Sequence, residues 1–313
     1  MKLARAVDVY IERKQSAGCK YTSPGRILLS FSRQLGNVAL ASIVPAQVSA
    51  FLNGPRTGVP TWRCKHGTLR VFFEYWALRG RVKTSPLPPN VPKCPSIFVP
   101  HIYSHAELHR LLDATAISQR GRSCVMDART FRTLLLFLYG TGMRLGEAVK
   151  LKCGEVDLNT GVITVRDTKF YKSRLVPLGR DVHELLRQYL LSPRRRRQRG
   201  ANLFSAKNGE PIKIDNVEHC FKRLRRHAGI VRRDVTSYQP RIHDLRHTFA
   251  VHRLTAWYKQ GADVQRLLPA LSTYLGHVEL KSTQRYLTMT PELLRQANIR
   301  FESYVRGGGH DDR

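Results

Sequence analysis

Residues 84–95 constrain the fold of this 313-residue chain more than any other segment, because they hold five prolines in twelve residues. Proline fixes φ and removes a backbone donor, so such a stretch cannot continue a helix and favours an extended linker. The residues on either side are therefore expected to fold separately. We predict an N-terminal domain over residues 1–84, a proline-rich linker over 85–100 and a C-terminal domain over 101–313.

The segment before the linker has the pattern of a small helical bundle. Apolar residues recur three and four positions apart, as in Leu69, Phe72, Phe73 and Trp76. This spacing predicts about four helices, over residues 4–17, 23–35, 45–52 and 62–79. Arg and Lys interleave with the apolar positions, which would give the bundle a core and a basic face; the alternative is that these charges merely solvate the helices.

The segment after the linker changes its period partway along. Ser104 and Glu107 form a capping-box pattern before a helix over 106–114, and residues 128–139 are apolar enough for a second helix. Residues 156–165 then read as two strands around a turn at 159–161, and 174–178 as a third. Further helices are predicted over 181–191, 216–228, 243–258, 263–275, 282–287 and 291–304. The predicted fold class is mainly α (α+β), with one small antiparallel sheet in the second domain.

The charge of the chain indicates a polyanionic partner. It has 53 Lys plus Arg against 23 Asp plus Glu, a net charge of +30 and a pI near 10.6. Residues 1–95 carry 15 basic and 3 acidic side chains, and the remainder carries 38 and 20. A charge spread over both parts suits a protein that surrounds double-stranded DNA better than one with a single basic tail. The alternative is a generally basic soluble protein.

Other features of the sequence restrict its location. It has no run of eighteen apolar residues and no apolar segment behind its N-terminus, so we expect neither a membrane span nor a signal peptide. We expect a cytoplasmic, nucleoid-associated protein. Its six cysteines contain no Cys-x-x-Cys pair and are expected to be reduced thiols.

Chemistry is concentrated near the C-terminus, where His243 and Arg246 are followed by His277 and then Tyr286. Arginine and histidine can hold the non-bridging oxygens of a phosphodiester while a phenolic oxygen attacks it. Arg144 lies among glycines, with Glu147 one helical turn away to orient it. Each residue alone would more often be structural, so the prediction depends on the set. Its cations are sufficient without a metal or cofactor.

Two lysines are predicted near the tip between the second and third strands. Lys169 at such a tip could enter a groove of DNA and protonate a leaving hydroxyl, and Lys172 could do the same. A solvated turn lysine is the alternative for either one.

A zinc site is an alternative interpretation of the residues that begin the helix predicted over 243–258. His243 and His247 are four residues apart and Asp244 follows the first, which approaches the His-Glu-x-x-His pattern. Aspartate is shorter than the glutamate that this pattern uses as a base, and the sequence offers no obvious third ligand. We therefore favour phosphodiester chemistry.

Taken together, these residues resemble the tyrosine recombinase, or phage integrase, family. The resemblance covers about 145 residues in five ordered pieces, which are residues 141–147 around Arg144, Lys169 with 172–178, 243–250 from His243 through Arg246, 275–277 ending at His277, and Tyr286.

The resemblance implies how the set would act. Tyr286 would attack the scissile phosphate and leave a 3′-phosphotyrosyl link with a free 5′-hydroxyl. Arg144, Arg246 and His277 would bind the phosphate, Lys169 would be the general acid and His243 would assist proton transfer.

The resemblance also implies an assembly. The N-terminal domain would bind DNA and the C-terminal domain would be catalytic, with four copies on two DNA sites, and accessory or sister recombinases are possible partners. Residues 291–304, which include Leu293, Leu294 and Ile299, would dock against a neighbouring copy or pack on their own subunit. A bacterial mobile element is the expected setting.

Two alternatives remain at the level of sequence. A type IB topoisomerase uses a similar set to relax DNA without joining two sites, but the Leu275-Gly276-His277 motif and the short N-terminal domain favour recombination. A basic DNA-binding protein without catalysis is the second, and mere binding needs no such set.

Overall fold

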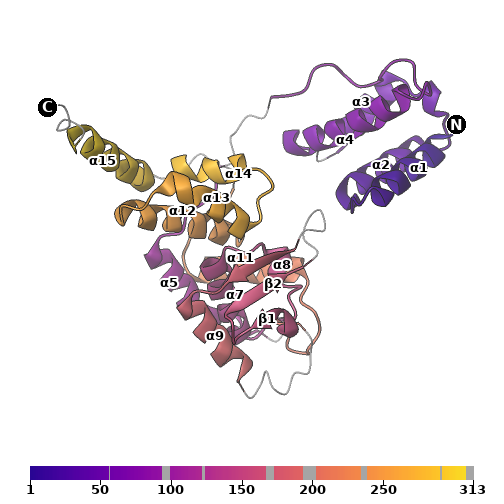
Figure 1. The fold of residues 1–313 in the computed structure, drawn as a ribbon. Coiled ribbons are helices and arrows are strands. Elements are labelled where there is room, and N and C mark those ends of the chain that lie inside the picture. Colours follow the sequence, from indigo (N-terminus) through magenta and orange to yellow (C-terminus); the bar gives the residue numbers. More distant parts are fainter. Residues whose placement is uncertain are drawn as a thin grey trace. The chain divides into compact units, whose positions relative to one another are not determined.

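A computed structural model of the protein describes residues 1–55, 57–93, 99–121, 124–166, 173–192, 202–233, 238–289 and 291–307. The chain forms two compact units, one built on residues 1–97 and the other on residues 98–168 and 172–313 (Figure 1). Helices dominate both units, and the single sheet lies in the second. The mainly helical fold class with a small antiparallel sheet is confirmed.

The first unit is a bundle of four helices, α1 (Leu3–Ser16), α2 (Thr22–Leu35), α3 (Pro45–Leu52) and α4 (Val59–Ala77), with a 3₁₀ turn η1 (Leu40–Ser42). These are the four helices that the apolar spacing predicts. Tyr10 lies at the centre of the core, where its ring makes edge contacts with Tyr21, Phe72 and Tyr75. The described linker residues 85–93 form no helix or strand, and Arg63 of α4 donates to the carbonyl of Pro92.

The second unit begins with α5 (His105–Asp113), and its predicted capping box is present: the Ser104 amide donates to Glu107 and the Glu107 amide donates to the Ser104 hydroxyl. The following helices are α6 (Thr115–Ser118), α7 (Ala128–Thr141), α8 (Leu145–Ala148), α9 (Arg180–Leu190), α11 (Ile214–His227), α12 (Asp244–Lys259), α13 (Val264–Leu275), α14 (Lys281–Gln284) and α15 (Pro291–Gly307), with 3₁₀ turns η2 (Cys153–Glu155) and η3 (Arg285–Thr288).

The sheet has three antiparallel strands in the order β1 (Val156–Asp157), β2 (Val162–Val165) and β3 (Arg174–Pro177). Ile163 pairs with both Val156 and Val176, so the apolar side chains of the three strands share one face. Ile163 and Val176 are fully buried against the core of the unit. This packing holds β3 in place, and β3 in turn positions the side chain of its first residue, Arg174.

A second apolar cluster positions the C-terminal elements. α12 packs against α7 on one side and against α13, η3 and α15 on the other. Phe249, Leu254 and Leu275 are buried in this cluster, together with Leu293 from α15. Leu294 and Ile299 of α15 are exposed. The docking of this helix against a neighbouring copy stays a prediction.

Two further expectations bear on location and redox state. None of the helices in the described ranges combines the length and apolar character needed to cross a membrane. The five cysteines within the described part of the chain form no disulfide bond with one another.

Candidate active site

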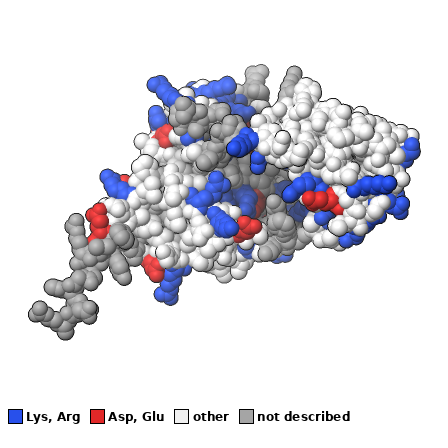
Figure 2. All heavy atoms as spheres, turned by 90° about the horizontal axis from the view of Figure 1, so that it is seen from above, with Lys and Arg blue, Asp and Glu red and all other residues white. Residues whose placement is uncertain are grey.

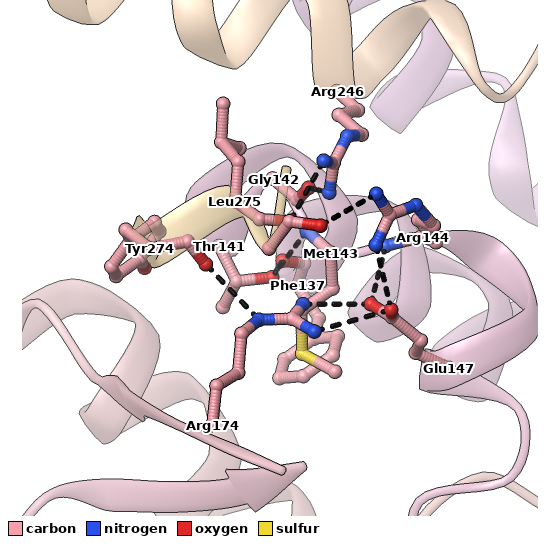
Figure 3. A network of polar contacts seen from close by, with 11 residues as sticks. Phe137, Thr141, Gly142, Met143, Arg144, Glu147, Arg174, Arg246, Tyr274 and Leu275 are labelled. Carbon is pink, nitrogen blue, oxygen red and sulfur yellow. Dashed lines mark hydrogen bonds and ion pairs between the residues drawn. The ribbon is translucent and has the colours of Figure 1, made fainter. Parts of the chain in front are cut away.

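Three arginines converge on the C-terminal end of α13. The carbonyl of Tyr274 accepts a hydrogen bond from Arg174 at 3.1 Å, that of Leu275 from Arg246 at 2.8 Å and that of Gly276 from Arg144 at 2.9 Å (Figure 3). The last carbonyls of a helix lack partners within the helix and carry the negative end of its dipole. These guanidinium groups satisfy them, so the helix end fixes the positions of the three cations.

Glu147 joins two of these arginines. Its carboxylate accepts from the side chain of Arg144 at 3.0 Å and from both terminal nitrogens of Arg174 at 3.2 and 2.7 Å (Figure 3). It also accepts from the backbone amide of Arg144. Burial alone would raise the pKa of Glu147, but the ion pairs with Arg174 and Arg144 outweigh it and leave the pKa below its ordinary value. Glu147 therefore stays ionised and orients Arg144, which is the contact that its spacing predicts.

Two glycines make the close approach of these elements possible. Gly142 ends α7 at φ +59°, and a Cβ there would lie 2.5 Å from the ring of Phe249. Gly276 ends α13 at φ +69°, and a Cβ there would lie 2.9 Å from Nη1 of Arg174. The carbonyl of Gly142 also accepts from Arg246 at 2.8 Å. Only glycine combines this backbone conformation with the space available.

Arg246 is the most enclosed cation of the cluster, with 3% of its surface exposed. Its two terminal nitrogens donate to the carbonyls of Gly142 and Leu275. Burial and the nearby charge of Arg144 lower the pKa of Arg246 to about 10, so it remains protonated at neutral pH. A buried charge held by neutral carbonyls retains most of its attraction for an anion.

Tyr286 lies in η3 with only 2% of its surface exposed. Its hydroxyl oxygen is 3.2 Å from Nδ1 of His247, and its ring stacks near that of His277 with centroids 6.1 Å apart. Burial raises the pKa of Tyr286, and the neighbouring Arg246 opposes this rise without cancelling it. The phenol is therefore neutral in the structure and is held beside a buried cation.

His277 follows directly after the glycine that ends α13. Its Nδ1 lies 2.7 Å from the hydroxyl of the buried Thr283. Burial and the positive charge of Arg246 lower the pKa of His277 to about 4, which makes the ring neutral at physiological pH. A neutral ring whose Nδ1 is engaged can present only Nε2 to a ligand.

His243 precedes the first turn of α12 and its side chain is exposed. Its ring meets that of His247 edge to face, with centroids 5.2 Å apart. Desolvation and the nearby charge of Arg246 lower the pKa of His243. The two histidines thus form a row that leads from the surface to Tyr286.

The zinc interpretation finds no ligand set in the described part of the chain. Asp244 is buried and accepts from the backbone and side chain of Arg241, at 2.9 Å and 3.0 Å. The ring of His247 faces Tyr286. The described residues contain no group of three His, Cys, Asp or Glu side chains placed to hold a metal ion.

The structure brings most of the residues predicted for the site into one cluster. Hydrogen bonds connect Arg144 and Arg246 through the end of α13, and a chain of ring contacts connects His243, His247, Tyr286 and His277. Lys169 and Lys172 lie outside the described residues, so their predicted role stays a prediction.

Two residues of the cluster were not assigned to phosphodiester chemistry from sequence. Arg174 reaches across 100 residues to the carbonyl of Tyr274, and nothing in its local sequence indicates that contact. The sequence indicates His247 only as a zinc ligand, although its position four residues after His243 puts both rings on one face of α12.

Comparison with known proteins agrees with this architecture. Residues 103–292 match the phage integrase family. The chain is 37% identical over 309 residues to the integrase/recombinase-type protein y4rB of Sinorhizobium fredii (strain NBRC 101917 / NGR234), covering 95% of this chain and 96% of that protein. It is 32% identical over 237 residues to the tyrosine recombinase XerC of Staphylococcus carnosus (strain TM300), covering 75% of this chain and 73% of that protein.

Solved structures share the fold. A lambda integrase fragment in a dimer bound to a COC′ core site superposes with a TM-score of 0.64 at 19% identity, covering 93% of this chain and 97% of that one. The Tn1549 transposon integrase in complex with a circular intermediate DNA gives a TM-score of 0.68 at 18% identity, covering 96% of this chain and 99% of that one. The chain belongs to the phage integrase family, whose tyrosine recombinases are DNA strand-transferring enzymes.

Proposed function

We propose that this protein is a site-specific tyrosine recombinase that cuts and rejoins DNA through a 3′-phosphotyrosyl bond at Tyr286. The observation that carries the proposal is the enclosure of a neutral phenol beside Arg246 and between two neutral histidines. A buried tyrosine is a weak nucleophile until cations neutralise the phosphate that it attacks. Arg246 and Arg144 supply those charges.

The phosphate would be held by Arg144, Arg246 and His277. The Arg144 side chain is 37% exposed and is braced by Glu147, so its remaining donors can face an incoming oxygen. If the Thr283 hydroxyl donates to Nδ1 of His277, the proton of that ring lies on Nε2 and can be donated to a phosphate oxygen. Such preorganised donors stabilise charge that develops in a transition state.

Two proton transfers would complete the reaction. Lys169 is proposed as the general acid that protonates the leaving 5′-oxygen, with Lys172 as its alternative, and His243 as a residue that assists proton transfer. The 5′-hydroxyl of another strand would then attack the phosphotyrosyl bond and restore Tyr286. The bond energy is conserved in the covalent link, so the cycle needs no nucleotide cofactor.

The partner would be double-stranded DNA. The net charge of +30 supports this, and Lys and Arg are spread over the visible face of the molecule with few acidic groups among them (Figure 2). The first unit would bind DNA and the second would carry out catalysis. A homotetramer on two DNA sites would exchange the strands, with accessory or sister recombinases as possible further partners.

A mobile genetic element is the proposed setting. Similarity to the S. fredii integrase/recombinase-type protein along nearly the whole chain supports integration or excision, and the shared fold of the Tn1549 transposon integrase is consistent with it. Transposition, integration and excision use the same cleavage and ligation chemistry.

Covalent capture tests this function. Wild-type protein and the Tyr286→Phe variant are incubated with fragmented host DNA, denatured in detergent, and the DNA that remains attached to protein is sequenced. Tyr274→Phe is a matched control, because Tyr274 is a partly buried tyrosine near the C-terminal end of α13. Its hydroxyl donates to the carbonyl of Pro177. Adducts from the wild type and the control, at one defined sequence and absent from Tyr286→Phe, are expected.

Other outcomes have a definite meaning. Adducts that persist in Tyr286→Phe would refute the assignment of the nucleophile. Relaxation of supercoiled DNA without joining of two sites would favour a topoisomerase, and DNA binding without any adduct would favour a non-catalytic binding protein.

A further inference from the structure

His247 has no role in the reaction proposed so far, yet its ring lies against the proposed nucleophile. We propose that His247 accepts the hydrogen bond of the Tyr286 hydroxyl and takes its proton when the phenolic oxygen attacks the phosphate. The inference rests on the proposed function, because it requires Tyr286 to be the nucleophile. His247 would then be a catalytic residue, since it touches a reacting atom.

The geometry is that of a preformed donor and acceptor pair. Nδ1 of His247 is 3.2 Å from the hydroxyl oxygen of Tyr286, within reach of a direct proton transfer. The ring centroids are 5.6 Å apart and the rings are tilted by 57°. Tyr286 is 2% exposed, so bulk water has little access to take its proton. A side-chain acceptor in direct contact is therefore the available route.

Both partners are held by the same apolar cluster. α12 and η3 pack on each other, and Phe249 and Ala250, just after His247, are buried together with Tyr286. The distance between the imidazole and the phenol is thus fixed by packing on both sides. This constraint separates the pair from a chance contact between two surface side chains.

His243 is less well placed for the same step. Its exposed ring contacts the edge of His247, with the centroids 5.2 Å apart. The proton of Tyr286 therefore meets His247 first, and His243 is the next group along the row toward solvent. This arrangement leaves His243 free to pass a proton outward or to act on the other side of the phosphate.

The protonation state of His247 suits an acceptor. Burial lowers the pKa of His247 to about 3, with smaller contributions from the neighbouring His243 and Arg246, so the ring is neutral and one nitrogen has a lone pair. With the proton on Nε2, that lone pair lies on Nδ1, facing Tyr286. A bound phosphate would offset the charge of Arg246 and raise the pKa of His247, which makes the ring a stronger base once DNA is present.

The step balances without any further reactant. The O–H proton of Tyr286 moves to Nδ1 of His247 as the phenolic oxygen bonds to phosphorus. The bond from phosphorus to the 5′-oxygen breaks, and that oxygen takes a proton from the general acid. In ligation the 5′-hydroxyl gives its proton back to the general acid as its oxygen attacks phosphorus, the phenolic oxygen leaves, and His247 returns the proton to it.

The test uses single-turnover formation of the covalent adduct on a nicked duplex that carries the sequence recovered by covalent capture. His247→Leu removes the acceptor, and we expect it to slow adduct formation by about 100-fold at pH 7, a typical contribution of a general base. The rate of this variant should rise with pH, because a larger fraction of the Tyr286 phenol is then ionised before it attacks. His247→Asn keeps an acceptor near the position of Nδ1 but cannot hold the proton, so its rate should be intermediate.

The chain provides a matched control on the same helix. Nδ1 of His252 lies 2.9 Å from the hydroxyl of Tyr139, so α12 carries a second histidine–tyrosine pair away from the arginine cluster. His252→Asn should form adduct at close to the wild-type rate. An equal loss in the two asparagine variants would overturn the proposal, because it would reflect damage to the helix instead of a lost base.

A substrate with sulfur in place of the 5′-bridging oxygen separates the two proton transfers. Such a leaving group needs no general acid, so a defect on the acid side should be rescued while the His247→Leu defect should persist. Full rescue of His247→Leu would place His247 on the leaving-group side and overturn the proposal.

The inference and the proposed function can fail separately. Loss of adduct in Tyr286→Phe with a wild-type rate in His247→Leu would refute the role of His247 and leave the function standing. Absence of any wild-type adduct in the capture experiment would refute both. A measurement without DNA checks the contact itself: the ¹³Cζ resonance of Tyr286 should shift in His247→Leu, and an unchanged resonance would refute the hydrogen bond.

Discussion

Arg174 and Glu147 form an ion pair of 2.7 Å that joins the start of β3 to α8, with side chains only 10% and 12% exposed. Arg174→Ala would leave part of a buried carboxylate unpaired and release the Tyr274 carbonyl. We expect it to lower the free energy of unfolding by about 3 kcal/mol, because breaking one side of a buried pair is costly. Calorimetry of the transition of the second unit would measure the loss.

An exposed ion pair with the same distance between its nitrogen and oxygen atoms is the control for this buried pair. Arg187 and Glu184 also lie 2.7 Å apart, but their side chains are 50% and 43% exposed. Arg187→Ala should change the free energy of unfolding much less than Arg174→Ala, because solvent screens an exposed ion pair. Similar losses in Arg174→Ala and Arg187→Ala would contradict the claim that burial makes the first pair important.

Gly276→Ala should disturb both the fold and the site. The residue has φ +69°, which disfavours any L side chain by about 1–2 kcal/mol, and the new Cβ would displace the Arg174 guanidinium. Gly261→Ala is a matched control, because Gly261 has φ +70° and open space around its Cβ position. We expect Gly276→Ala to lower the melting temperature more than Gly261→Ala and to slow adduct formation, and equal effects would refute the steric argument.

Sequence patterns predicted the elements well because each depends on local periodicity. The capping box at Ser104 and the hairpin around Gly161 are both encoded within a few residues and are present in the structure. Several boundaries differed by one to three residues, and one element differed in type: residues 282–287, predicted as a single helix, form α14 followed by the 3₁₀ turn η3. Tight packing of Tyr286 against α12 accounts for the narrower turn, and such tertiary packing has no local signal.

The site was only partly predictable from the sequence, because its key contacts are tertiary and have no local signal. Arg144 and Arg246 stand in recognisable motifs, but their common anchor is the carbonyl end of α13, and backbone carbonyls have no identity in a sequence. The contact of Arg174 with Tyr274 depends on how the sheet meets that helix. The pairing of His247 with Tyr286 depends on how η3 meets α12.

Thr283→Val should slow cleavage with little change in fold. Valine has nearly the shape of threonine and fills the same buried space, but it cannot bond to Nδ1 of His277. The ring would lose the contact that keeps its proton on Nε2, and we expect about a tenfold slower adduct formation at saturating DNA. Thr273→Val is the control, since its exposed hydroxyl bonds only to the carbonyl of Pro269 in its own helix. A wild-type rate for Thr283→Val would count against a tautomer set by this contact.

DNA affinity should depend steeply on salt. If the basic surface neutralises about six to ten phosphates, the association constant should fall by roughly 10³ to 10⁵ between 50 and 200 mM salt. Fluorescence anisotropy with a labelled duplex, using Tyr286→Phe to prevent cleavage, would measure the slope. A slope near zero would contradict phosphate contacts as the main source of affinity.

Stability should decrease as the pH falls from about 6.5 toward 4. Burial lowers the folded-state pKa of His247 to about 3 and that of His277 to about 4, whereas both rings have ordinary pKa values in the unfolded chain. Below pH 6.5 the unfolded state therefore binds more protons than the folded state, so protons favour unfolding. Each such histidine contributes a slope of at most about 1.4 kcal/mol per pH unit. Glu147, with a lowered pKa, adds to the loss only at more acidic pH.

Urea unfolding at several pH values between 7 and 4.5 would measure this slope. His277→Asn and His247→Asn should each make it shallower, because neither side chain can take up a proton. His219→Asn is the control, because that histidine is exposed on α11 and lies outside the cluster. Bound DNA should also flatten the slope, since the phosphate anion would stabilise the protonated rings in the complex. A slope that is the same in all three variants would show that other groups govern the acid sensitivity.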